Sequence, residues 1–251
     1  MLRNGIIVLA LLAALAGCGT RSISNSGYQE NGYSGGNPLY QGEIGDLDLF
    51  VPQGSSQNLE GGIAKALADN HPVVARRGKP LLVVQSGAWA PDDMMIDLLK
   101  GRFQVAPFSG IPERSSYPAI STASAPAPGS YGERLRLAAA QGGYEQILVY
   151  WGQLDALRSG GVTKAVSWVP IVGAVIPDES QDMRIRLKAA IIDVASGRWR
   201  MIQPDAIENS AISAWINRAS SDQDQVQRLK AAGYAKLADM IIGEASAATS
   251  N

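Results

Sequence analysis

The chain has 251 residues, of which 22 are basic and 23 acidic, so its formal net charge is −1. This balance argues against a nucleic-acid ligand, because phosphate binding needs a surplus of Lys and Arg on one face. With one cysteine and one histidine, the chain lacks the residues for a disulfide framework or a Cys/His metal cluster. Its length suits one domain with a substantial hydrophobic core.

The first eighteen residues are typical of a bacterial secretion signal. Arg3 precedes an uncharged apolar run from Ile6 to Ala16, which ends on small residues before Cys18. A helix over 5–17 would be roughly 20 Å long, too short for the roughly 30 Å hydrocarbon core of a bilayer. Leu15-Ala16-Gly17-Cys18 resembles the lipobox of bacterial lipoproteins. The alternatives are an ordinary signal peptide with a chance cysteine, or an uncleaved apolar anchor.

The lipobox resemblance implies how the chain is processed and where in the cell it is located. It implies that residues 1–17 are removed as a signal peptide and that Cys18 is acylated, palmitate being a typical chain. Two or more acyl chains hold a protein firmly to a membrane. Gly19 follows the cysteine, where aspartate commonly retains a lipoprotein in the inner membrane. We therefore expect a protein of the cell envelope, held by lipid on the outer membrane and facing the periplasm.

Residues 18–42 are predicted to form a flexible tether. Between Gly19 and Gln41 the chain is rich in Gly, Ser, Asn, Tyr and Gln and has no repeating apolar face. Such a segment buries too little apolar surface to offset its conformational entropy. A single globular domain is expected over 43–246, standing off the membrane, with a frayed tail at 247–251.

The first elements of the domain are short. Apolar and polar residues alternate over 47–51, which predicts a strand. The spacing of Leu59, Ile63 and Leu67 places one apolar stripe on a helix. His71, the only histidine, follows beside Pro72 in a predicted loop, where we expect solvent contact rather than catalysis.

The region 79–204 determines the fold class. Continuous apolar runs at 81–84 and 147–151 indicate strands covered on both faces, with a further strand over 103–108. Helices are predicted after Asp92-Asp93, whose carboxylates suit a helix N-terminus, and over 131–141. This order predicts an α/β (α+β) domain: a mixed sheet in two or three layers, with flanking helices and one long antiparallel hairpin.

The hairpin is predicted over 182–201. Apolar residues alternate with basic ones, and Ser196-Gly197 supplies the turn. The basic side chains are candidates for binding an acidic partner, although Lys and Arg on an exposed sheet face are also a common means of staying soluble. These candidates are Arg184, Arg186, Lys188, Arg198 and Arg200.

The stretch 165–177 carries no charge and includes Trp168, a further candidate for partner binding. It is predicted to be a covered strand or an apolar loop. A membrane-spanning strand of an oligomeric barrel is the alternative, which Pro170 and Gly173 disfavour. Beyond Pro204 the chain is predicted to be helical, with an apolar cluster over 207–216 and a last helix that begins near Ser220 and packs on the sheet.

The order of these elements carries a resemblance. The strand at 81–84, Gly101-Arg102-Phe103-Gln104-Val105, the strand at 147–151 and Ala195-Ser196-Gly197 resemble the α/β fold of periplasmic lipoproteins related to the curli-secretion lipoprotein and to the lipoprotein activators of penicillin-binding proteins. The resemblance implies protein binding: an adaptor or assembly factor for another envelope protein, or a subunit of an oligomeric outer-membrane secretion pore.

An envelope hydrolase is the remaining alternative. The sequence offers neither a Cys/His metal cluster nor a glycine-rich phosphate loop, and a Ser-His-Asp site would have to use His71. We therefore expect no catalytic residue, no metal and no cofactor, and we expect the membrane and another envelope protein as partners. The oligomeric state stays open.

Overall fold

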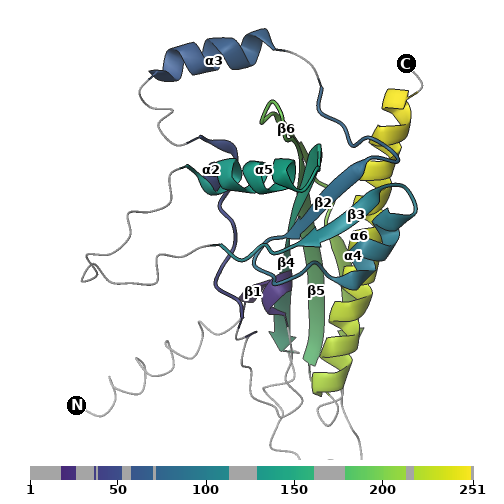
Figure 1. Cartoon of the computed structure of the whole chain (residues 1–251). Helices are drawn as coiled ribbons and strands as arrows, with labels where there is room; N and C mark the ends of the chain where they lie inside the picture. Colours follow the sequence, from purple (N-terminus) through teal and green to yellow (C-terminus); the bar gives the residue numbers. More distant parts are fainter. Residues whose placement is uncertain are drawn as a thin grey trace, which may run out of the picture.

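The computed structural model of the chain is drawn in Figure 1, and it describes residues 18–26, 37, 39–52, 58–69, 72–112, 129–160, 179–212 and 218–249. Within these residues the protein is one open mixed sheet of seven strands with five α-helices. The prediction of a single α/β domain with flanking helices is confirmed. His71, Trp168 and the stretch 165–177 lie outside the described residues.

The parallel half of the sheet is built from two strand–helix–strand crossovers. β2 (Pro80–Gln85) connects through α4 (Asp93–Lys100) to β3 (Gln104–Phe108), and β3 connects through α5 (Tyr131–Gln141) to β4 (Gln146–Gly160). Both β3 and β4 run parallel to β2, one on each side of it. The two helices therefore lie on opposite faces of the sheet. This is expected for right-handed crossovers, because the first runs from β2 to β3 and the second runs back in the opposite direction, past β2 to β4.

The antiparallel half is organised around β5 (Glu179–Asp193). β5 pairs with β4 over its whole length, and β6 (Trp199–Ile202) and β7 (Ile207–Ile212) both pair with its other edge. The predicted turn at Ser196-Gly197 is present, with Gly197 at φ 73°, a conformation that glycine adopts without strain. The long hairpin is thus confirmed, and its longest pairing is with the preceding strand β4.

Two hydrophobic cores lie on the two faces of the sheet. Leu81, Val83 and the alternate apolar residues of β5 face α4 and the long helix α6 (Arg218–Thr249). Leu82 and Val84 face the opposite way, towards α2 (Asp46–Phe50) and α5. Both faces of β2 are therefore dry, which explains why its sequence is continuously apolar rather than alternating.

Within the described residues, helices cover the second face at one end only. Ala190 and Ile192 of β5 are buried under the α2/α5 side, whereas Lys188, Arg186 and Arg184, on the same face, lie beyond these helices and are partly or fully exposed. The change from basic to apolar residues along one face of β5 thus marks the edge of the helical layer.

The predicted tether at 18–42 is wrong for its first part. Cys18–Ser22 form β1, which pairs antiparallel with β4, and the following 3-10 helix η1 (Ile23–Asn25) places Ile23 in the core. Backbone pairing with an open strand needs no amphipathic pattern, so composition alone did not reveal it. The described part of the sheet therefore includes Cys18, the residue expected to bear the lipid.

Four further predictions are wrong in type or extent. Residues 46–50 form helix α2 rather than a strand, with Asp46 and Asp48 in its first turn. Residues 207–212 form β7 rather than a helix, and α6 runs on to Thr249, past the predicted end of the domain. β4 also continues past Gly152, where an added Cβ would meet the side chains of Leu187 and Ile23; this glycine permits close packing instead of ending the strand.

Helix α3 (Leu59–Ala68) is confirmed as a helix but not as a core element. None of its residues is buried. Figure 1 shows it apart from the sheet, at the end of the molecule where α2 and α5 lie and away from β1.

Candidate functional site

Two of the basic residues predicted on β5, Arg184 and Arg186, converge on one carboxylate. Asp155 accepts hydrogen bonds from Arg184 Nε at 2.7 Å, Arg186 Nη2 at 3.0 Å and Thr20 Oγ1 at 2.9 Å. Strand register brings them together, because Asp155 is the cross-strand partner of both Thr20 and Arg184. The arrangement ties β1, β4 and β5 together near Cys18.

This cluster predicts a specific acid sensitivity. Burial alone would raise the pKa of Asp155, but the hydrogen bonds from Arg184, Thr20 and Arg186 outweigh it and bring the pKa below its ordinary value. Because the folded pKa is depressed, the stabilisation is complete above the unfolded pKa of about 3.9 and is lost as pH falls through the folded pKa. Asp155→Asn should therefore have a lower unfolding free energy than the wild type at neutral pH, and this difference should disappear in acid.

Urea unfolding at a series of pH values checks this expectation. The difference between wild type and Asp155→Asn should shrink as pH falls below about 4, whereas Asp97→Asn, at an exposed pair with Lys100, should show little difference at any pH. A difference between wild type and Asp155→Asn that stays constant into acid would contradict the role given to this carboxylate.

The remaining basic candidates are paired in other places. Lys188 Nζ lies 2.7 Å from a carboxylate oxygen of Asp46 and 4.8 Å from the ring centroid of Trp151. Arg198 pairs with Asp69, the residue that ends α3, and Arg200 pairs with Glu244 on α6, each at 2.8 Å. The basic residues therefore do not form one free patch, and a role for them in partner binding stays a prediction.

A hollow of about 380 Å³ lies beside Lys188 and Arg186. One wall is Glu43, whose pKa is raised by burial in spite of the hydrogen bond that Ser22 donates to it. Trp151, on β4, donates a hydrogen bond from Nε1 to the carbonyl oxygen of Ile44 at 2.9 Å. The hollow is thus lined by residues that attach the N-terminal segment to the sheet.

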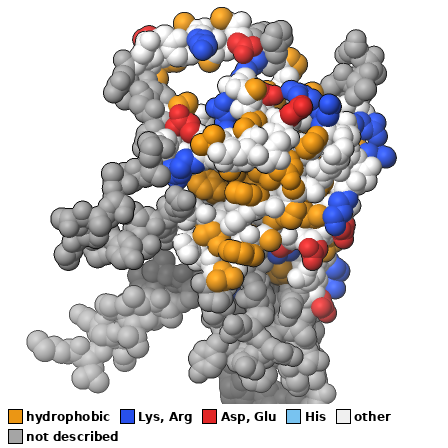
Figure 2. All heavy atoms as spheres, viewed as in Figure 1, with side chains coloured by type: hydrophobic (Ala, Val, Ile, Leu, Met, Phe, Trp, Pro, Cys, Tyr) orange, Lys and Arg blue, Asp and Glu red, His pale blue; other side chains and the backbone are white. Residues whose placement is uncertain are grey.

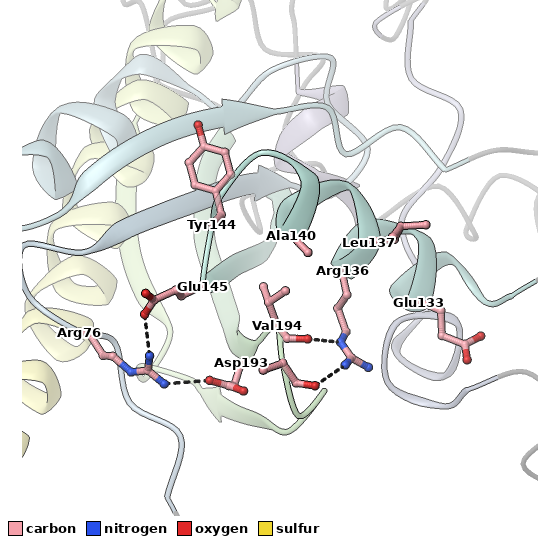
Figure 3. A pocket seen from close by; sticks show the side chains of 10 residues that line it. Arg76, Glu133, Arg136, Leu137, Ala140, Tyr144, Glu145, Asp193 and Val194 are labelled. Atoms are coloured by element: carbon pink, nitrogen blue, oxygen red, sulfur yellow. Dashed lines mark hydrogen bonds and ion pairs between the residues drawn. The ribbon is translucent and has the colours of Figure 1, made fainter.

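A second groove lies at the other end of the domain, between α5 and the turn that follows β5 (Figure 3). Its volume is about 580 Å³. Its apolar surface comes mainly from the outer side of α5 and from the turn, and charged side chains line its rim. The lining residues are Arg76, Glu133, Arg136, Leu137, Ala140, Tyr144, Glu145, Asp193, Val194 and Ala195.

Two arginines hold the rim of this groove, hereafter the α5 groove. Arg76 bridges Glu145 and Asp193 with two contacts of 2.9 Å, and Arg136 donates hydrogen bonds to the carbonyls of Val194 and Ala195 at 2.9 and 3.0 Å. Figure 3 shows both sets of contacts along one side of the groove. The arginines fix the turn relative to α5, so the groove is a built feature of the fold.

The floor of the α5 groove is open to solvent. Leu137 is 60% exposed although it is a leucine in the middle of a helix, and Ala140, one turn further along, is also exposed. In Figure 2 hydrophobic side chains reach the surface of the domain, and charged side chains of both signs gather between them and α3. This combination of apolar floor and mixed-charge rim is typical of a surface that contacts another polypeptide.

A buried polar network lies on the opposite side of the sheet. Asp92 accepts hydrogen bonds from Tyr234 at 2.5 Å and from Lys230 at 3.0 Å, and its backbone N–H donates to Gln85 at 2.8 Å. The Tyr150 hydroxyl donates to the same Gln85 oxygen, and burial raises the pKa of both tyrosines well above 10. The sequence predicted a capping role for Asp92, but its side chain makes no cap hydrogen bond. It joins α4 to α6 instead.

Within the described residues, no helix is long and apolar enough to cross a membrane. The same residues contain no group of three or more His, Cys, Asp or Glu side chains placed to hold a metal ion.

Sequence reasoning missed the α5 groove. Arg76, Leu137 and Asp193 come from separate parts of the chain, and only the fold brings them together. One signal was present: Leu137 is apolar but lies outside the buried stripe of α5, which includes Leu135 and Ala139. A leucine on the solvent side of an amphipathic helix is common, so this signal alone does not distinguish a binding surface.

The family of this chain follows from a match that covers most of the domain. The family model of the YafT bacterial lipoproteins matches residues 46–244, from the start of α2 to near the end of α6. A comparison with curated proteins found no match. The chain therefore belongs to the YafT bacterial lipoprotein family.

Proposed function

We propose that this lipoprotein is a non-enzymatic adaptor of the cell envelope, which binds an apolar segment of another envelope protein in the α5 groove. In this proposal acyl chains on Cys18 hold it on the periplasmic side of the outer membrane. The resemblance to curli-secretion and penicillin-binding-protein-activator lipoproteins points in the same direction. The observation that carries the proposal is the position of the groove relative to the lipid-bearing residue.

Cys18 and the α5 groove lie near opposite ends of β4. Cys18 pairs with Leu157 near the end of β4, whereas Glu145 of the groove immediately precedes Gln146, the first residue of that strand. At about 3.3 Å per residue, the two are separated by roughly 35–40 Å. Because β1 begins at Cys18, the sheet itself sets this distance, and the groove faces away from an anchoring bilayer.

The chemistry of the α5 groove favours a polypeptide over a small charged ligand. Its charged side chains already neutralise one another, with Arg76 between Glu145 and Asp193, and its exposed surface is largely leucine, alanine and tyrosine. An apolar side chain of a partner would gain about 25 cal/mol per Å² that it removes from water there. The mixed-charge rim suits the polar backbone that surrounds such a side chain.

In-cell photocrosslinking tests this function. A photoreactive residue at Leu137 should trap a second envelope protein in membranes, and the product should be lost with Cys18→Ser, which removes the acylated thiol. The matched control is Leu98, an exposed leucine on α4 at the opposite face of the sheet. Products that are equally abundant from Leu98, or no heavier product from Leu137, would refute the proposal.

A further inference from the structure

We infer that α3 is a movable cover of the α5 groove: in a closed state its apolar row packs on the groove floor, and a partner segment has to displace it. The closure itself requires only this chain. Its regulatory meaning rests on the proposed function.

The first observation is that α3 is amphipathic, yet none of its residues is buried in the described part of the structure. Leu59, Ile63 and Leu67 are 55%, 44% and 77% exposed, although they lie one above another on one face of the helix. Asn58 caps the first turn by accepting a hydrogen bond from the Gly61 N–H at 3.2 Å. An isolated helix of this length is marginal in water, and tertiary packing of its apolar face normally supplies the missing stability. The helix therefore needs a partner surface.

The second observation is that the ends of α3 are attached on two sides of the α5 groove. At its C-terminal end, Asp69 pairs with Arg198 and lines a hollow of about 230 Å³ that shares Arg76 and Asp193 with the groove. At its N-terminal end the chain comes from α2, which packs against α5, the other wall of the groove. In the described part of the chain, the residue that ends α3 and the helix that precedes it are thus both fixed beside the surface that α3 would cover.

The third observation is that the chain lengths permit closure. α3 has ten residues and is about 15 Å long. The links from Val51 to Leu59 and from Asp69 to Val73 reach at most about 27 Å and 13 Å when extended. An apolar helix face and an apolar groove of the same chain are both exposed, so burying one against the other would remove both from water.

Disulfide trapping tests the closed state without any partner. In the full lipid-anchored chain, whose single cysteine is Cys18, we expect Ile63→Cys with Leu137→Cys to form an intramolecular disulfide under mild oxidation. The control pair is Lys65→Cys with Leu137→Cys, since Lys65 lies on the opposite face of α3. Because α3 has no buried residue, these changes should not unfold the domain.

The outcomes separate this inference from the proposed function. Rapid trapping from position 63 and slow trapping from position 65 support the cover. Equal rates overturn it, as does a disulfide found only between two chains, which would assign the groove to a second copy. If neither pair forms a disulfide, the labelling measurement described next decides. Failure to capture an envelope partner from Leu137 would leave the trapping result unchanged and would refute only the proposed function.

A second measurement covers the possibility that the thiol geometry is poor. With Leu137→Cys alone, Ile63→Asp should make the thiol react several-fold faster with a water-soluble maleimide, because a charged residue disfavours closure. Lys65→Asp should leave the rate unchanged. A rate that does not respond to Ile63→Asp overturns the inference.

Discussion

Asp92→Ala is expected to lower the unfolding free energy by about 3 kcal/mol, because it leaves the ammonium group of Lys230 buried without its carboxylate. Lys230 is only 8% exposed, and Asp92 lies 3.0 Å from its Nζ. The same change removes the acceptor of the Tyr234 hydroxyl, which is fully buried in the core beside Tyr150. Asp92 is partly exposed, so the expected value lies at the lower end for a broken buried pair. Equilibrium urea unfolding measures it.

The matched control is the next residue. Asp93→Ala removes an exposed carboxylate from the first turn of α4, which should cost no more than about 1 kcal/mol. Adding Lys230→Met to Asp92→Ala should recover part of the loss, because it removes the stranded charge and keeps most of the volume. Equal losses for Asp92→Ala and Asp93→Ala would show that Asp92 acts only as a helix-terminal charge, as the sequence had suggested.

The sequence predicted the centre of the sheet because burial there leaves a pattern. In β5 the alternation from Met183 to Ile191 corresponds to one dry face, and the continuous run of β2 corresponds to two. Helix α5 was predicted from its composition and stripe, and its start at Ser130 and Glu133 forms a capping box. In each of these elements, the spacing of apolar residues along the sequence reflects which side of the element is buried.

The wrong predictions concern segments whose structure is determined by contacts with distant parts of the chain. Five residues over 46–50 fit a strand or a single helical turn equally well, and only the packing of Leu49 beneath α5 selects the helix. β1 pairs through its backbone, which every sequence possesses. Gly152 is a strand breaker by propensity, but the close approach of Ile23 from the other end of the chain requires a glycine there.

The same reasoning explains why the candidate site was found only in part. Arg184 and Arg186 were selected for alternation, but Asp155, which neutralises both, lies on another strand. The α5 groove combines residues from 76 to 195, and no local period connects them. Sequence spacing describes one element at a time, whereas a groove is a relation between elements.

Gly132→Ala tests the contact between α5, one wall of the groove, and α2, the helix that precedes α3. We expect the unfolding free energy to fall by about 2 kcal/mol, because the added methyl group overpacks this contact. A Cβ at this position would collide with the backbone carbonyl oxygen of Leu49 in α2, which cannot move away as a flexible side chain would. α2 must shift, and with it Leu49 leaves the second core and Phe50 loses its stacking on Trp199, at 4.1 Å between ring centroids. Urea unfolding gives the loss.

Gly101→Ala is the matched control. Gly101 ends α4 in a right-handed helical conformation with open space around its Cα, so alanine there should be neutral or should stabilise by up to about 1 kcal/mol. If Gly132→Ala were equally harmless, α2 would be free to slide on α5, and the N-terminal attachment of α3 would not be fixed beside the groove. A clearly larger loss of unfolding free energy from Gly132→Ala than from Gly101→Ala would therefore support both the packing of the second core and the proposed cover. Both depend on the contact between α2 and α5.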